Sequence, residues 1–318
     1  MRHFTFVVCV IASGSGLKWN LTGVTVAGNG ASGHNAENLN QPRWLYIDAN
    51  DILYICDYNN NRIQRWLLGA TNGTTVAGQS DGSAGAGSNQ LHQPGGIDFD
   101  NNGYMYVADS GNDRVQRYAP NSNNGTTVAG SAGNEGSATN ELHQPVGVVV
   151  DDNFNIFISD MGNKRVVKWA ANATNGTILI DGSSNGAANG QLKNPYGILL
   201  INGSSNQIYL SDQNKDYVGI WTFGAGIANT TWFTANGTDL NQPTQITMDR
   251  YGNLYVADMN NQRVVVFCPN STTGNVVVGT GTNTTPTLQH VGGIAFDSNL
   301  NLYVSDINEN KVFKYARL

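Results

Sequence analysis

One segment recurs six times along the chain, and this recurrence limits the possible folds more than any other feature. A representative copy is LNQPTQITMDRYGNLYVADMNNQRVVVF, which starts at Leu240. The copies follow one another at intervals of 48 to 52 residues and begin at Leu39, Leu91, Leu142, Leu192, Leu240 and Leu288. A fixed period of this length is typical of architectures in which each unit packs only against its neighbours.

Each copy predicts three short strands, and a fourth strand follows after a loop. Residues 95–99, 254–258 and 114–118 are examples of the first, second and third strands, all rich in β-branched and aromatic residues. The fourth strand starts near Thr74, Thr126, Thr177, Thr230 or Val276. The first two strands are joined by a turn headed by Asp48, Asp100, Asp151, Asp249 or Asp297, and aspartate favours such turns. Four strands in about 50 residues describe a propeller blade.

The pattern P-x-G-I-x-x-D, then N-L-Y-V-A-D, then x-x-N-x-R-V resembles the NHL repeat, and the copies cover nearly all of residues 19–318. The Trp-Asp and Gly-His signatures of WD-type blades are missing from the repeats. We therefore predict an all-β fold, a six-bladed β-propeller of four-stranded blades, formed by a single domain over residues 17–318.

The two ends of the chain complement each other. The sixth unit stops at Leu318 after its third strand, whereas residues 23–28, GVTVAG, match the fourth strands of other units, such as TTVAG at Thr74. We predict that this N-terminal strand joins the last blade and closes the ring. Closure removes an open sheet edge that would promote aggregation.

The first 16 residues, MRHFTFVVCVIASGSG, combine a basic start, an apolar run and small residues. This pattern predicts a secretory signal peptide; the alternatives are the ragged end of a fragment and a buried strand. The apolar run is too short to span a bilayer, so we expect no membrane span. The spacing of Cys9, Cys56 and Cys268 fits no metal site, and we interpret them as unpaired, buried thiols.

A polar motif, D-x-x-N-x-R, follows the second strand in four units. A catalytic centre needs one constellation, whereas a structural requirement recurs in every blade. We therefore interpret the motif as a structural turn in which Asp and Asn satisfy backbone groups and Arg pairs with the carboxylate. Its charged residues are Asp57 and Arg62, Asp109 and Arg114, Asp160 and Arg165, and Asp258 and Arg263. Units four and six, with Asp212 and Asp306, depart from the pattern and are expected to have looser turns.

No residue is assigned to catalysis, to a cofactor or to a metal. The peptide-amidating lyases, which this repeat resembles, carry zinc-binding His just after the repeat proline, where this chain has Arg43, Gly95, Val146, Tyr196 and Thr244. The calcium lactonases use carboxylate and amide ligands near the channel, and here only Asp98 and Gln245 are candidates. His92 and His143 share one repeat position and are candidates for a shared rim ligand, although Asn40, Lys193 and Asn241 at that position favour a polar loop.

Seven N-x-[ST] sequons fall between third and fourth strands, where a blade is exposed. They are Asn20, Asn72, Asn124, Asn172, Asn175, Asn229 and Asn270. Together with the signal peptide they predict a secreted glycoprotein; the alternative is that these residues serve only in turns.

The variable loops before each inner strand suggest a recognition surface. We predict a noncatalytic, monomeric scaffold that binds a protein or a glycan through these rim loops. The alternative is a propeller enzyme of the lactonase or amidating-lyase type with a channel metal. The net charge of −6 and the sequence pI of about 5.2 oppose nucleic-acid binding, although some NHL domains bind RNA.

Overall fold

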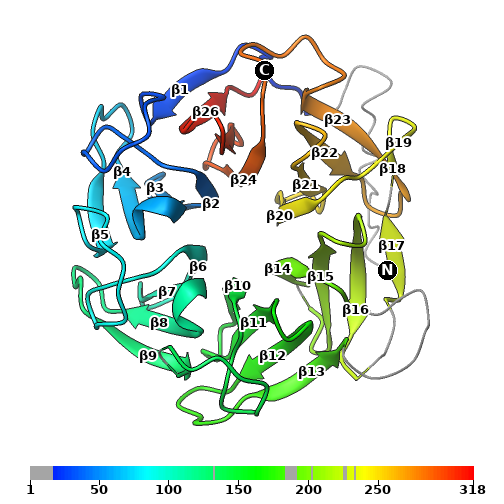
Figure 1. Cartoon of the computed structure of the whole chain (residues 1–318). Coiled ribbons are helices and arrows are strands. Elements are labelled where there is room, and N and C mark those ends of the chain that lie inside the picture. The colour runs from blue at the N-terminus through cyan, green and yellow to red at the C-terminus, as the bar shows by residue number, and fades with distance from the viewer. Residues whose placement is uncertain (1–16, 132, 183–191, 202, 225–227, 233) are drawn as a thin grey trace.

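The chain folds into a ring of six β-sheets around a central axis, and the innermost strand of each sheet faces this axis, which we call the channel (Figure 1). The computed structural model describes residues 17–131, 133–182, 192–201, 203–224, 228–232 and 234–318. The sequence-based predictions of an all-β fold and of six blades are confirmed, because each blade contains four antiparallel strands. The predicted signal peptide, residues 1–16, lies outside the described residues.

The first three blades repeat one plan, from an inner strand at the channel to an outer strand at the periphery. Blade 1 contains β2 (Pro42–Ile47), β3 (Leu53–Asp57), β4 (Arg62–Trp66) and β5 (Thr74–Gly78). Blade 2 contains β6 (Pro94–Phe99), β7 (Met105–Asp109), β8 (Arg114–Tyr118) and β9 (Gly125–Gly130). Blade 3 contains β10 (Pro145–Val150), β11 (Ile156–Asp160), β12 (Arg165–Trp169) and β13 (Thr177–Asp181). Short 3-10 turns, η2 (Tyr58–Asn60) and η3 (Ser110–Asn112), follow the second strands of blades 1 and 2.

The remaining blades follow the same plan with one addition. Blade 4 contains β14 (Pro195–Leu200), β15 (Gln207–Asp212), β16 (Tyr217–Thr222) and β17 (Thr230–Trp232). Blade 5 contains β20 (Pro243–Met248), β21 (Leu254–Asp258), β22 (Arg263–Phe267) and β23 (Thr273–Gly279). The short strands β18 (Thr234–Ala235) and β19 (Thr238–Asp239) extend the sheet of blade 5 beyond β23. Blade 6 contains β24 (Val291–Phe296), β25 (Leu302–Asp306) and β26 (Lys311–Tyr315).

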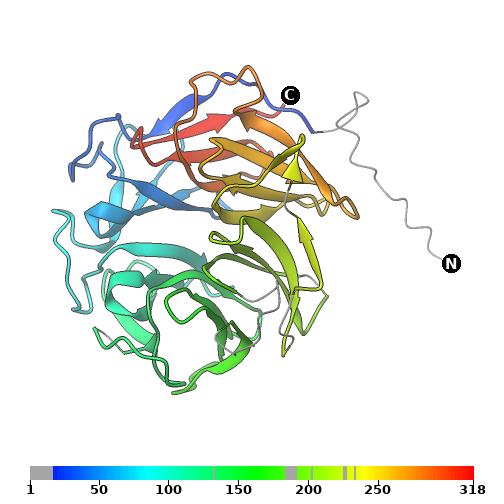
Figure 2. The ribbon, with the colours of Figure 1, turned by 45° about the vertical axis from the view of Figure 1, so that its right-hand side comes forward.

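The N-terminal strand completes blade 6, as the sequence predicted. Strand β1 (Val24–Ala27) pairs antiparallel with β26, with Thr25 opposite Phe313. In Figures 1 and 2 the blue β1 lies beside the red β26 in both views. The buried Trp19 adds a second link to this blade, because its indole N–H donates to the Leu300 carbonyl at 2.9 Å. The outer edge of β26 is therefore covered.

The core lies between adjacent blades. One cluster joins Cys56 and Ile63 of blade 1 to Ile97 and Val107 of blade 2, and similar clusters fill the other blade contacts. These side chains sit at alternating strand positions, as expected for sheets that pack face to face. Burial of this kind makes each blade depend on its neighbours for stability.

Glycine at the third position of most inner strands allows the strands to approach one another around the channel. A Cβ at Gly147 would meet the Tyr196 carbonyl of the next blade, and one at Gly293 would meet the Arg43 carbonyl. Where this position carries a side chain, Trp44 stacks on the Tyr196 ring and Gln245 hydrogen-bonds to Leu45 and Ile294. The glycine of the repeat therefore permits close contact between inner strands of neighbouring blades.

Cys268 is disulfide-bonded, so our interpretation of unpaired thiols is wrong for this residue. Cys56 is a free thiol buried between blades 1 and 2. Among the described residues, no helix is long and apolar enough to cross a membrane.

Candidate active site at the channel mouth

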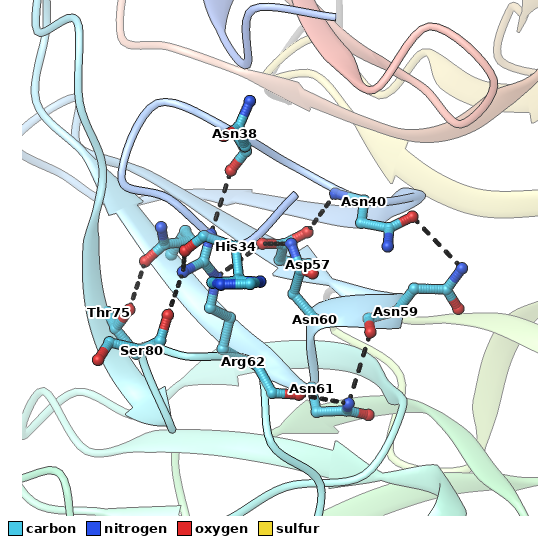
Figure 3. Close-up of polar contacts among 12 residues, drawn as sticks. His34, Asn38, Asn40, Asp57, Asn59, Asn60, Asn61, Arg62, Thr75 and Ser80 are labelled. Carbon is cyan, nitrogen blue, oxygen red and sulfur yellow. Dashed lines mark hydrogen bonds and ion pairs between the residues drawn. The ribbon is translucent and has the colours of Figure 1, made fainter. Parts of the chain in front are cut away.

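Each repeated Asp–Arg pair joins the end of the second strand of a blade to the start of the third, and Figure 3 shows the pair Asp57 and Arg62 of blade 1. The Asp57 carboxylate accepts hydrogen bonds from Arg62 Nε, Asn60 Nδ2 and the Asn40 backbone N–H at 2.7 to 2.8 Å. The remaining Arg62 nitrogens donate to four carbonyls, those of His34, Asn35, Asn38 and Ser80. Burial raises the pKa of Asp57, while the Arg62 charge and the three donors oppose this shift. The guanidinium therefore holds the loop that enters the blade as well as the turn.

The other three copies of the motif repeat this geometry. Their Arg Nε to Asp oxygen distances are 2.6 to 2.7 Å, in the pairs Asp109–Arg114, Asp160–Arg165 and Asp258–Arg263. In units four and six, Asp212 and Asp306 instead accept backbone N–H groups of the entering loop and of their own turn. With every oxygen and nitrogen of the complete pairs engaged in the fold, these residues are poor candidates for catalysis.

The predicted glycosylation sites are all accessible. The side chains of Asn20, Asn72, Asn124, Asn172, Asn175, Asn229 and Asn270 are exposed. Their exposure is compatible with modification, which stays a prediction.

The two metal-ligand candidates from the sequence are engaged inside the channel. Asp98 accepts the Val150 backbone N–H at 2.8 Å, and burial raises its pKa to about 7. The Gln245 amide accepts from the backbone N–H groups of Leu45 and Ile294 and donates to the Leu45 carbonyl, which joins blades 1, 5 and 6. Among the described residues, no three His, Cys, Asp or Glu side chains form a metal-binding group. The residues present do not fit the channel metal of our alternative hypothesis, so no step below uses one.

A ring of polar side chains surrounds the channel mouth, and sequence analysis missed it. The residue directly before each inner strand is an amide in five blades and a histidine in the sixth: Gln41, Gln93, Gln144, Asn194, Gln242 and His290. All four glutamines of this ring have positive φ, between 50° and 54°, which is uncommon for a residue with a side chain. A hydrogen bond from the previous blade supports each of these backbones: for example, the Gln93 N–H donates to Asn61 Oδ1 at 2.9 Å. The signal in the sequence was the repeated Gln-Pro pair.

Two adjoining cavities occupy the mouth, with volumes of about 200 and 340 Å³. Arg43 and Tyr196 line both cavities and reach them from blades 1 and 4, on opposite sides of the ring. Glycine follows the proline position in both blades next to blade 1, at Gly95 and Gly292, and a Cβ at Gly292 would meet the Pro42 and Arg43 carbonyls. The Tyr196 ring stacks on Trp44 with centroids 6.5 Å apart.

The charges at the mouth come from few groups. Arg43 Cζ lies 3.6 Å from the centroid of the Tyr58 ring, and Arg43 Nε is buried without a hydrogen-bond partner. Burial raises the pKa of Tyr196, so its hydroxyl is neutral near pH 7. Burial lowers the pKa of His290; Asp306 opposes this shift and the Arg43 charge adds to it. The 340 Å³ cavity therefore combines a neutral imidazole, a neutral phenol and a guanidinium.

The other two rim histidines have separate neighbours. His92 Nδ1 lies 3.1 Å from the Gly111 carbonyl, and His143 Nε2 lies 3.2 Å from Glu135 Oε2. Neither lines the mouth cavities. His290 differs from them because it takes the place of the glutamine that precedes the inner strand.

Two larger grooves, of about 550 and 510 Å³, lie away from the channel, one between blades 1 and 2 and one between blades 2 and 3. Each collects side chains from only two blades. The mouth collects them from all six, and it contains the histidine with a lowered pKa. Convergent polar groups with perturbed pKa values mark candidate active sites, so we favour the mouth over the larger grooves.

Comparison with known proteins supports the repeat and the ring. Residues 240–267 match the family model described as the NHL repeat. No curated protein matches the chain at a significant level.

Similar solved structures include a gluconolactonase from Xanthomonas campestris, with 14% identity and a TM-score of 0.64 over 89% of this chain and 88% of that one. A streptogramin B lyase has 14% identity and a TM-score of 0.55, with 86% and 78% of the two chains covered. An auxiliary nutrient binding protein from Bacteroides thetaiotaomicron has 14% identity and a TM-score of 0.67, with coverage of 93% and 76%. At this identity the likeness concerns the fold.

The neighbours correct our functional prediction. We predicted a noncatalytic scaffold that binds a protein or a glycan through its rim loops, whereas the gluconolactonase and the streptogramin B lyase favour the enzymatic alternative. The physical reason for the error lies in the rim: we looked for metal ligands after the repeat proline and overlooked the polar ring before it.

Proposed function

Because the chain is a six-bladed β-propeller that carries an NHL repeat, we propose that it is an enzyme of the lactonase or lyase type, which opens an ester bond of a small molecule at the channel mouth. One observation carries the proposal. His290, with its lowered pKa, lines the same cavity as Tyr196 and Arg43. A cavity of this size suits a small molecule.

The chemistry follows from these groups. In lactone hydrolysis, the His290 imidazole accepts a proton from water as the oxygen of that water bonds to the carbonyl carbon. The Tyr196 hydroxyl is suited to donate a hydrogen bond to the carbonyl oxygen as negative charge develops there. The ring C–O bond then breaks, and the imidazolium returns the proton to the alkoxide. The product is a hydroxy acid.

The proposal is tested by acid release from a panel of sugar lactones and cyclic depsipeptides. We expect turnover of at least one member and a decrease of about 100-fold or more in kcat/KM for His290→Gln. The matched control is His143→Gln, which removes a rim histidine outside the cavities and should retain activity. No turnover across the panel, or equal activity of the two variants, would contradict the proposal.

We also propose that the protein is secreted and glycosylated. The seven exposed sequon asparagines and the disulfide at Cys268 support this, because disulfides persist in oxidising compartments.

A further inference from the structure

Arg43 is a cation without a carboxylate partner. Each of the buried arginines Arg62, Arg114, Arg165 and Arg263 pairs with an aspartate. No such ion pair involves Arg43 among the residues that the structure describes, and no Asp or Glu is among the side chains that line either cavity. In a chain with a net charge of −6, this places an isolated positive charge at the mouth.

The contacts of Arg43 hold its guanidinium at the two cavities and leave part of its hydrogen-bonding capacity unused. The Tyr58 ring covers one face of the plane, a contact that orients a guanidinium without using its N–H groups, and the side chain also hydrogen-bonds to Tyr196. The Nε atom is buried without an acceptor, and an unsatisfied buried donor is costly until a partner arrives. A guanidinium edge matches a carboxylate, which accepts two parallel hydrogen bonds.

The rest of the lining is rich in amides. Gln41, Gln93, Gln144 and Asn194 reach the cavities from the ring before the inner strands, and Gln213 and Asn308 reach them from the turns after the second strands. An amide both donates and accepts, which suits hydroxyl groups. A ligand that satisfies this lining carries several hydroxyls and one anionic group.

We propose that the channel mouth selects a hydroxylated small molecule with a permanent carboxylate, of the uronic-acid type, and that Arg43 binds this carboxylate. The inference rests on the proposed function only in its use of the same cavities. For a lactonase, the substrate class is then a sugar lactone that keeps a free carboxylate beside the ester. Arg43 determines specificity, whereas His290 and Tyr196 act at the ester.

Calorimetric titration of the whole chain with glucuronate and glucose tests the inference, because the two sugars differ only in a carboxylate at carbon 6. We expect glucuronate to bind at least 10-fold more tightly than glucose, with an affinity that falls as salt rises. Acetate, which has the charge without the hydroxyls, should bind more weakly than glucuronate. The methyl ester of glucuronate should behave like glucose.

Substitution of Arg43 tests whether this residue causes the preference for glucuronate. Arg43→Gln should reduce glucuronate affinity at least 10-fold and leave glucose unchanged, and Arg43→Lys should retain part of the preference. The matched control is Arg65→Gln, since Arg65 also has a buried Nε without a partner but lines the groove between blades 1 and 2. Melting curves confirm that each variant is folded.

Equal affinities for glucuronate and glucose, no binding of either, or an unchanged preference in Arg43→Gln would overturn the inference. The proposed function can fail separately. Glucuronate binding through Arg43 without any lactone turnover would refute the enzyme and keep the anion site. Lactone turnover with no preference for substrates that carry a carboxylate, in the wild type and in Arg43→Gln alike, would keep the enzyme and refute the anion site.

Discussion

The side chain of Asn310 accepts a hydrogen bond from the Gln41 backbone N–H at 2.9 Å, although the two residues are 269 positions apart. The contact joins blade 6 to blade 1 and supports a glutamine with a φ of 54°. Asn310 itself has a φ of 51°, where asparagine is better tolerated than most residues.

We expect Asn310→Ala to lower the free energy of unfolding by about 1–2 kcal/mol, because it removes an acceptor and places alanine in a left-handed conformation. Urea denaturation measures the change. Asn310→Asp keeps the acceptor and should stay close to the wild type. Equal losses in both variants would show that the hydrogen bond does not stabilise the closure.

Removal of the charge from one repeated pair should be more damaging. Arg62→Met leaves the Asp57 carboxylate buried and takes donors away from four carbonyls, so we expect a loss of about 3–5 kcal/mol, seen as a lower denaturation midpoint. Arg65→Met is the control on the same strand, where no ion pair is lost. A loss no greater than that of the control would show that Arg62 is dispensable.

Titration of His290 tests the electrostatics of the mouth without any substrate. Its pKa is below 6.5 because of burial, and the Arg43 charge contributes, so Arg43→Gln should raise it. NMR of the imidazole measures both values. Because the unfolded chain binds this proton more readily than the folded one, His290 lowers stability as pH falls below 6.5 toward the lowered pKa. A His290 pKa that does not rise in Arg43→Gln would mean that the two groups are not coupled.

Phe154 has a φ of 61°, at the turn position where Gly103 and Gly252 stand in other blades. Its side chain is 37% exposed, so it contributes little burial. We expect Phe154→Gly to be more stable than Phe154→Ala by about 1 kcal/mol, since only glycine removes the left-handed strain. Thermal unfolding of the two variants measures this difference in stability. If Phe154→Ala proves as stable as Phe154→Gly, the backbone at this turn is not strained.

Expression in a eukaryotic secretory host tests the proposed compartment. Mass spectrometry should find glycans on Asn72 and Asn124, which are exposed in the turns before outer strands. Asn101 and Asn123 are exposed asparagines outside sequons and should stay unmodified. Unmodified Asn72 and Asn124 would remove the sugar argument for secretion.

The fold could be predicted from the sequence because the strand pattern that produces it is repeated. Six copies of one strand pattern made each strand predictable, and the missing fourth strand of the last copy predicted the partner of Val24 and Thr25. Strands β18 and β19 were not predicted, since they are two residues long and occur once, with a parallel contact to β23. A single short strand has no counterpart in the pattern.

The candidate site was harder to predict from the sequence, because its residues are not repeated. Its chemistry lies in departures from the repeat, such as His290 in place of a glutamine and Arg43 beside two glycine positions. Whether Arg43 has a carboxylate partner depends on which side chains the ring brings to the mouth. Alignment of the copies shows the substitutions, but only the closed ring shows that Arg43 and Tyr196 meet.

The pairing of β1 with β26 also imposes an order in time. Thr25 leaves the ribosome about 290 residues before its partner Phe313. At ordinary rates of synthesis this interval is roughly 15 to 60 seconds. For that period blades 1 to 5 are able to assemble while the first strand waits unpaired, because β1 can pair with β26 only after β26 has been synthesised.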